Sequence, residues 1–131
     1  MNASPILGVV YKGGSTILLA RVLGSDGEPI TQAAITAAAY TISPVDPEAP
    51  DDDTPITGHS AVPVAPSALI HDTLQLDALW GDLDVTGYNF RHEIDISEHQ
   101  AFAARGCQYR VRWTLTTSGQ TIVFDFLVDA I

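Results

Sequence analysis

Apolar and polar residues alternate with a period of two through much of this chain, most regularly in its last third. Such alternation is typical of strands that bury one face. It predicts strands over residues 88–96, 109–116 and 121–128, with a hairpin turn at 116–120 between the last two. The side chains on the apolar faces of these segments are Tyr88, Phe90, His92, Ile94 and Ile96, then Tyr109, Val111, Trp113 and Leu115, then Ile122, Phe124, Phe126 and Val128.

The first half of the chain shows shorter strand patterns between turn residues. Residues 6–11 and 16–23 are apolar runs, and the second is apolar on both faces except at Arg21, which is typical of a central strand. Asp26 and Gly27 predict a tight turn after it. Residues 33–43 mix alanines, which favour helix, with β-branched and aromatic residues, which favour strand; the neighbouring strands favour a strand here too. Residues 73–79 alternate as a further strand.

The proline content changes in the middle of the chain. Six of the eight prolines lie between residues 44 and 66, which predicts a long exposed connection within a single domain spanning residues 1–131. Its tip, residues 46–53, carries five acidic side chains, and residues 56–64 can contribute a short edge strand.

Composition narrows the class of protein. Of the 131 residues, 46% are hydrophobic and 17% charged, enough apolar material for a packed core, which excludes a disordered chain. The formal net charge is −10, and the six basic residues are scattered, which argues against nucleic acid as a partner. The sequence shows neither a signal-peptide pattern nor an apolar run of the ~20 residues that a membrane span needs.

No spacing typical of a catalytic or metal site stands out. The four histidines are far apart, and His92 shares an apolar strand face, so we expect it to be a packed side chain. Cys107 is the only cysteine, which excludes an intramolecular disulfide and favours a small buried side chain. We therefore expect no enzymatic activity, no cofactor and no bound metal.

Two loops carry candidate interaction residues. The run Asp51, Asp52 and Asp53 offers oxygen atoms but lacks the spacing of a calcium loop, so a solvated acidic tip is the favoured interpretation. Trp80 lies beside Gly81 in a predicted loop, where it either caps the end of the domain or contacts a ligand. Trp113, by contrast, alternates with apolar neighbours and is expected in the core.

The spacing of Phe102, Gly106 and Tyr109 resembles the crossing between two sheets in immunoglobulin-like and fibronectin-like sandwiches. In those domains a tyrosine early in the penultimate strand turns its hydroxyl back to the backbone of the corner that precedes it. The resemblance implies this role for Tyr109; the alternative is an ordinary core tyrosine that follows a loop glycine.

Residues 20–35, with Gly14, Ser15 and Thr16 ahead of them, are similar in outline to bacterial and phage immunoglobulin-like modules. Among these are the N-terminal module of phage baseplate upper proteins and other tail-associated or virion-decorating domains. The resemblance implies an immunoglobulin-like antiparallel β-sandwich of Greek-key topology with about seven to nine strands.

The same resemblance implies a function. It is that of a non-enzymatic structural protein of a phage or phage-like particle, located in the virion as a tail, neck, baseplate or capsid-decorating module. Its partners would be other virion proteins, in a homo- or hetero-oligomeric assembly without nucleic acid or membrane contact. The alternative is a carbohydrate-binding or adhesin-like module that uses Trp80.

Overall fold

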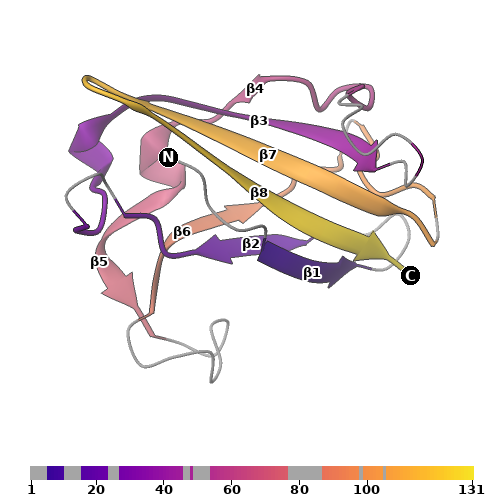
Figure 1. The fold of residues 1–131 in the computed structure, drawn as a ribbon, viewed down its shortest axis with the longest axis horizontal. Helices are drawn as coiled ribbons and strands as arrows, with labels where there is room; N and C mark the ends of the chain where they lie inside the picture. The colour runs from indigo at the N-terminus through magenta and orange to yellow at the C-terminus, as the bar shows by residue number, and fades with distance from the viewer. Residues whose placement is uncertain are drawn as a thin grey trace.

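The computed structural model describes residues 6–10, 16–23, 27–45, 48, 54–76, 87–97, 99–104 and 106–131 (Figure 1). The strands are β1 (Ile6–Val10), β2 (Ile17–Ala20), β3 (Ile35–Val45), β4 (Val62–Pro63), β5 (Ile70–Gln75), β6 (Tyr88–Glu93), β7 (Gln108–Thr117) and β8 (Thr121–Ala130). Two short 3-10 helices, η1 (Gln32–Ala34) and η2 (Pro66–Ala68), precede β3 and β5. Within these described ranges, no helix is both long and apolar enough to cross a membrane.

The strands form two sheets, which we call sheet A and sheet B. Sheet A has the order β1-β8-β7-β3-β4, and sheet B the order β2-β6-β5. The predicted all-β sandwich is thus confirmed, and this division of strands is that of an immunoglobulin-type sandwich. One pair departs from the expected antiparallel arrangement, because β1 runs parallel to β8. These two strands stand at opposite ends of the sequence, so no hairpin forces them to run in opposite directions.

The ambiguous alanine-rich segment is a strand, as predicted. It forms β3, which pairs with β7 along almost its whole length, and Tyr40 lies opposite Trp113. Ala38, Tyr40 and Ile42 of this strand are buried in the hydrophobic core. The helix preference of the alanines is therefore outweighed by pairing and burial between segments distant in sequence.

The proline-rich connection is less exposed than its composition predicts. β3 continues through Pro44 to Val45, and β4 forms the expected edge strand against β3. His59 is only 2% exposed, and Ile56, Val62 and Val64 pack against the core. The expectation of an exposed connection from 44 to 66 therefore fails at His59, which is buried, and at the three apolar side chains that pack against the core.

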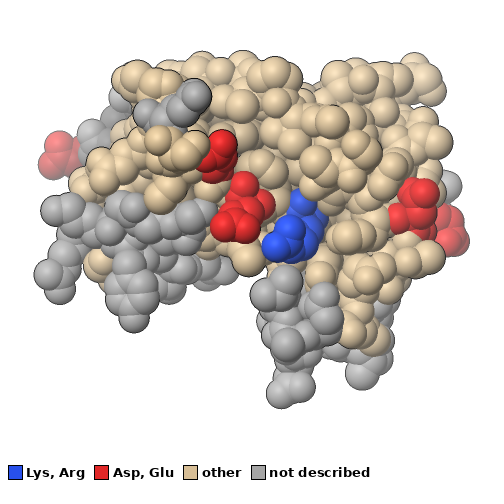
Figure 2. Space-filling view, turned by 180° about the vertical axis from the view of Figure 1, so that it is seen from behind, with Lys and Arg blue, Asp and Glu red and all other residues tan. Residues whose placement is uncertain are grey.

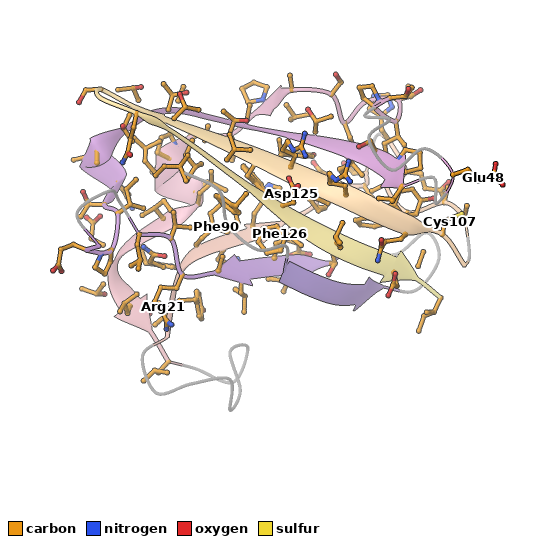
Figure 3. The ribbon with its side chains drawn as sticks, viewed as in Figure 1. Arg21, Glu48, Phe90, Cys107, Asp125 and Phe126 are labelled. Atoms are coloured by element: carbon orange, nitrogen blue, oxygen red, sulfur yellow. The ribbon has the colours of Figure 1, made fainter. Side chains whose placement is uncertain are left out.

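Aromatic rings from both sheets fill the space between them. Phe90 of sheet B lies 4.9 Å from Trp113, 5.2 Å from Phe124 and 5.9 Å from Phe126 of sheet A, measured between ring centroids. Figure 3 shows Phe90 and Phe126 meeting between the sheets. Trp113 is fully buried, as its alternation predicts. Val111, two residues after Tyr109, is also fully buried, at the position where antibody domains carry the second cysteine of their disulfide.

Asn89 is buried although the alternation of β6 places it on the polar face. Its exposed fraction is 0%. The backbone N–H of Val22 donates to its Oδ1 at 2.7 Å, and its Nδ2 donates to the carbonyls of Val22 and Ile30 at 3.0 and 3.3 Å. Asn89 therefore fastens both ends of the connection between β2 and β3 onto sheet B.

Candidate binding surface

The outer face of sheet A presents polar, small and apolar side chains. Strand alternation turns Tyr109, Val111 and Trp113 of β7 inward and leaves the residues between them outward. The same alternation applies to β8. The partly exposed side chains of this outer face include Thr41, Arg110, Arg112, Thr114, Asp125 and Leu127.

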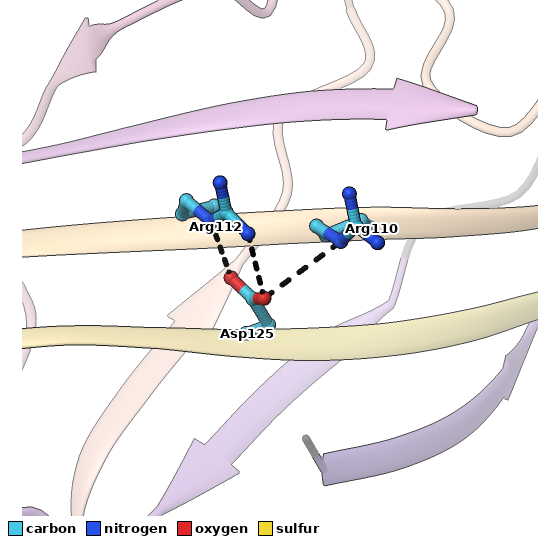
Figure 4. Close-up of polar contacts among 3 residues, drawn as sticks. All are labelled: Arg110, Arg112 and Asp125. Atoms are coloured by element: carbon cyan, nitrogen blue, oxygen red, sulfur yellow. Dashed lines mark hydrogen bonds and ion pairs between the residues drawn. The ribbon is translucent and has the colours of Figure 1, made fainter. Parts of the chain in front are cut away.

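A carboxylate between two arginines lies at the centre of this outer face (Figure 4). Arg112 stands opposite Asp125 in the hairpin register, and its Nε and Nη2 donate to the two carboxylate oxygens at 2.8 and 3.1 Å. The Nε of Arg110 lies 3.7 Å from Oδ2 of the same carboxylate. The side chains of Arg110 and Asp125 are 16% and 19% exposed, and that of Arg112 is 40% exposed. A two-pronged contact of this kind fixes the orientation of the guanidinium and contributes about 1 kcal/mol at a solvated site.

The predicted sheet-crossing corner is present at the end of the segment that leads into β7. The backbone N–H of Ala104 donates to the hydroxyl of Tyr109 at 2.9 Å. Phe102 is fully buried, and its ring packs edge-on against that of Tyr109 at 5.4 Å. Gly106 has a φ of 83°, a conformation that side-chain-bearing residues rarely adopt. The hydroxyl turns back to the corner as the resemblance implied, which distinguishes Tyr109 from an ordinary core tyrosine.

The corner predicts that removal of the Tyr109 hydroxyl lowers the free energy of unfolding by a measurable amount. We expect Tyr109→Phe to lower the free energy of unfolding by about 1–2 kcal/mol, because the Ala104 N–H loses its acceptor in a part-buried hydrogen bond. Urea denaturation followed by circular dichroism measures this change, and an unaltered slope against urea shows that the compared states are the same. A loss below about 0.3 kcal/mol would contradict a role for the hydroxyl in the corner.

A second cluster joins the end of the proline-rich connection to the sandwich. The Nε2 of His59 donates to the carbonyl of His99 at 2.9 Å, so its Nδ1 accepts from the hydroxyl of Tyr40, also at 2.9 Å. Burial, with the nearby negative charge of Asp95, raises the pKa of the Tyr40 hydroxyl. The ring of His99 occupies the space where any side chain at Gly58 would lie. Because both nitrogens of His59 are engaged, this buried histidine is a structural link between the connection and the segment after β6.

His92 is a packed side chain, as its place on the apolar face predicts. Its ring lies 4.9 Å from that of Trp113 and 5.3 Å from that of Tyr40. Its Nδ1 is buried without a hydrogen-bond partner among the described residues. Burial, and secondarily the positive charge of Arg91, lower the pKa of His92 to about 4. The ring is therefore neutral at pH 7 and resists protonation in the folded state.

This shift predicts that the domain loses stability in mild acid. Between pH 6.5, where an unfolded histidine titrates, and about pH 4, the unfolded chain binds more protons than the folded one, so the free energy of unfolding falls as the pH falls. We expect His92 to contribute about 2 kcal/mol of this fall, after allowance for solvent screening of a partly exposed ring. Urea denaturation of the unsubstituted chain and of His92→Met at pH 7, 5.5 and 4.5 isolates the contribution. Parallel stability profiles for the two chains would exclude it.

An open depression of about 420 Å³ lies at the end of β6 and in the segment after it. Its lining residues are Glu93, Ile94, Asp95, Ile96 and Ser97. The hydroxyl and backbone N–H of Ser97 donate to Oδ1 of Asp95 at 2.7 and 2.9 Å. These two bonds lower the pKa of the Asp95 carboxyl. Among the described residues, no group of histidine, cysteine, aspartate and glutamate side chains is placed to hold a metal ion.

The other residues predicted from the sequence do not belong to these clusters. Trp80, Asp51, Asp52 and Asp53 lie outside the described residues, so their proposed roles stay predictions. Cys107 is exposed, so the expectation of a buried cysteine is wrong. It lies just before β7, where its N–H donates to the carbonyl of Ala104 at 3.3 Å. Figure 3 places it at the end of the molecule.

Two features of the structure were not predicted from the sequence. The ion pair between Arg112 and Asp125 could have been found, because a turn between Thr116 and Thr121 places these residues opposite each other. The burial of Asn89 had no local signal, since its partners lie more than fifty residues earlier in the chain.

The fold and the outer face of sheet A define this chain as an immunoglobulin-like sandwich domain with a broad, ordered sheet surface. Comparison with known protein families, with curated proteins and with solved structures found no match.

Proposed function

We propose that this chain is a non-enzymatic structural protein of a phage or phage-like particle, in which it occupies a tail, neck, baseplate or capsid-decorating position through protein–protein contacts. The observation that carries the proposal is the outer face of sheet A, with its fixed arginine–carboxylate centre. The phage setting is supported by the sequence resemblance of residues 20–35, and the tyrosine corner supports the immunoglobulin-like fold.

The outer face of sheet A suits a protein partner for two physical reasons. Its side chains stand on paired strands of ten or eleven residues, so little conformational entropy remains to be lost when a partner binds. Its composition mixes threonines, small and apolar residues with arginines, and arginine is enriched at protein interfaces.

Gradient sedimentation of particles from the source cells tests this function. We expect the chain to travel with the particles in a constant ratio to their major protein. A tagged Arg112→Glu copy is expected to be incorporated at least tenfold less than the unsubstituted chain. A matched copy carrying Arg91→Glu, the same charge change on sheet B, should be incorporated normally. A chain that is found only as free protein at the top of the gradient would overturn the proposal.

A further inference from the structure

We infer that the outer face of sheet A is a self-association surface, on which two copies of this chain pair about a two-fold axis. The inference rests on the proposed use of this surface for protein contacts and names the partner as a second copy. Three properties of sheet A support it: its net charge, its size and the arrangement of its charged side chains.

The strands of sheet A carry none of the net charge of the chain. Their charged residues are Arg110, Arg112, Asp125 and Asp129, whose charges sum to zero. The other four basic and fourteen acidic residues of the chain therefore hold the whole charge of −10. Two copies repel each other wherever these remaining charges face one another, and Figure 2 shows acidic side chains on both sides of the basic group seen from behind. Sheet A is the surface on which two copies meet with the least electrostatic cost.

The dimensions of sheet A match a small specific interface. β3, β7 and β8 contain 11, 10 and 10 residues. Such strands are about 33 Å long, and three of them about 4.8 Å apart cover on the order of 500 Å². Two faces in contact then remove on the order of 1,000 Å² from water, which is the size of a weak, reversible protein contact.

The charged groups are arranged in a way that complements a second copy. The arginines stand on β7 and the acids on the neighbouring strand β8, so the outer face has a basic side and an acidic side. Asp129 is exposed, and the side chain of Arg112 keeps 40% of its surface exposed. In a two-fold contact every pairing occurs twice: if residue i of one copy touches residue j of the other, then residue j of the first copy touches residue i of the second. One rotation thus brings the basic side of each copy over the acidic side of the other, with half-exposed Leu127 and Val123 beside the contact.

Sedimentation velocity of the purified full chain tests this inference at physiological salt over protein concentrations from about 1 to 500 μM, the range in which a small interface associates. We expect a reversible dimer. Arg112→Glu, which makes sheet A acidic, should weaken dimerisation at least tenfold, whereas Arg91→Glu should change it less than twofold. Thr114→Glu introduces a charge on the same face without removing an ion pair, so it keeps the test valid if Arg112→Glu fails to fold; it should weaken dimerisation to a similar degree.

Three outcomes overturn the inference: a monomer at every concentration, a dimer weakened equally by Arg91→Glu, or a dimer indifferent to Thr114→Glu. The two proposals fail separately. A chain that is monomeric in solution but travels with particles overturns self-association and leaves the particle function standing. A chain that forms the dimer but never travels with particles overturns the particle function and leaves self-association standing.

Discussion

Replacing Trp113 by alanine is expected to lower the free energy of unfolding by about 4 kcal/mol, the largest effect of any single substitution considered for this domain. Its indole is fully buried and contacts the ring of Tyr40 on β3 and the rings of Phe90 and His92 on β6. Alanine removes these contacts and leaves a cavity that surrounding strands, held by their ladders, fill only in part.

Trp113→Phe serves as the graded control for this prediction. It keeps an aromatic ring, and the indole Nε1 has no hydrogen-bond partner among the described residues, so no bond to them is lost with it. We expect it to cost about 1–2 kcal/mol, since only part of the volume is removed. Urea denaturation followed by circular dichroism measures both variants. Equal costs for phenylalanine and alanine would show that packing of the ring does not stabilise the core.

Asn89→Ala is expected to cost about 3 kcal/mol, although the side chain is small and polar. The substitution leaves the N–H of Val22 without its acceptor, and the carbonyls of Val22 and Ile30 lose a donor, in a place with 0% exposure. A buried polar group without a partner retains the full cost of leaving water. The connection between β2 and β3 should therefore detach from sheet B before the whole domain unfolds.

Hydrogen exchange distinguishes this local effect from a general loss of stability. We expect the Val22 amide to exchange at least tenfold faster in Asn89→Ala than in the unsubstituted chain, under conditions where the amides of β7 and β8 stay protected. Gln108→Ala serves as the control, because it also removes a side-chain amide, but one whose hydrogen bond to Asp129 is exposed. This control should change the free energy of unfolding by less than about 0.5 kcal/mol. A Val22 amide that remains fully protected in Asn89→Ala would refute the role of Asn89.

The residues that were predictable are those whose environment is set by their own strand. The alternation of β7 and β8 placed Trp113, Phe124 and Phe126 in the core because successive side chains of any strand point to opposite faces. The tyrosine corner was predictable for a similar reason: Tyr109 and its partner Ala104 are only five residues apart, so their spacing is visible in the sequence.

The residues that were misjudged depend on distant segments. Asn89 has the alternation of an exposed residue, but a connection more than fifty residues away in the chain covers it. His59 lies in a segment whose prolines predict exposure, and its two partners, Tyr40 and the carbonyl of His99, come from β3 and from the segment after β6. Pairwise distances of this kind cannot be obtained from periodicity, because periodicity describes one element at a time.

The amino-acid sequence alone predicts an all-β chain with enough apolar residues for a packed core, a strong negative charge and no intramolecular disulfide. Local alternation and turn chemistry suffice to predict the strands, and residue counts give the core, the charge and the lack of a disulfide. Tertiary contacts alone account for the parallel pairing of β1 with β8 and for the burial of Asn89 and His59. These features result from contacts between segments far apart in the chain, whose free energies depend on which strands become neighbours when the sheets form.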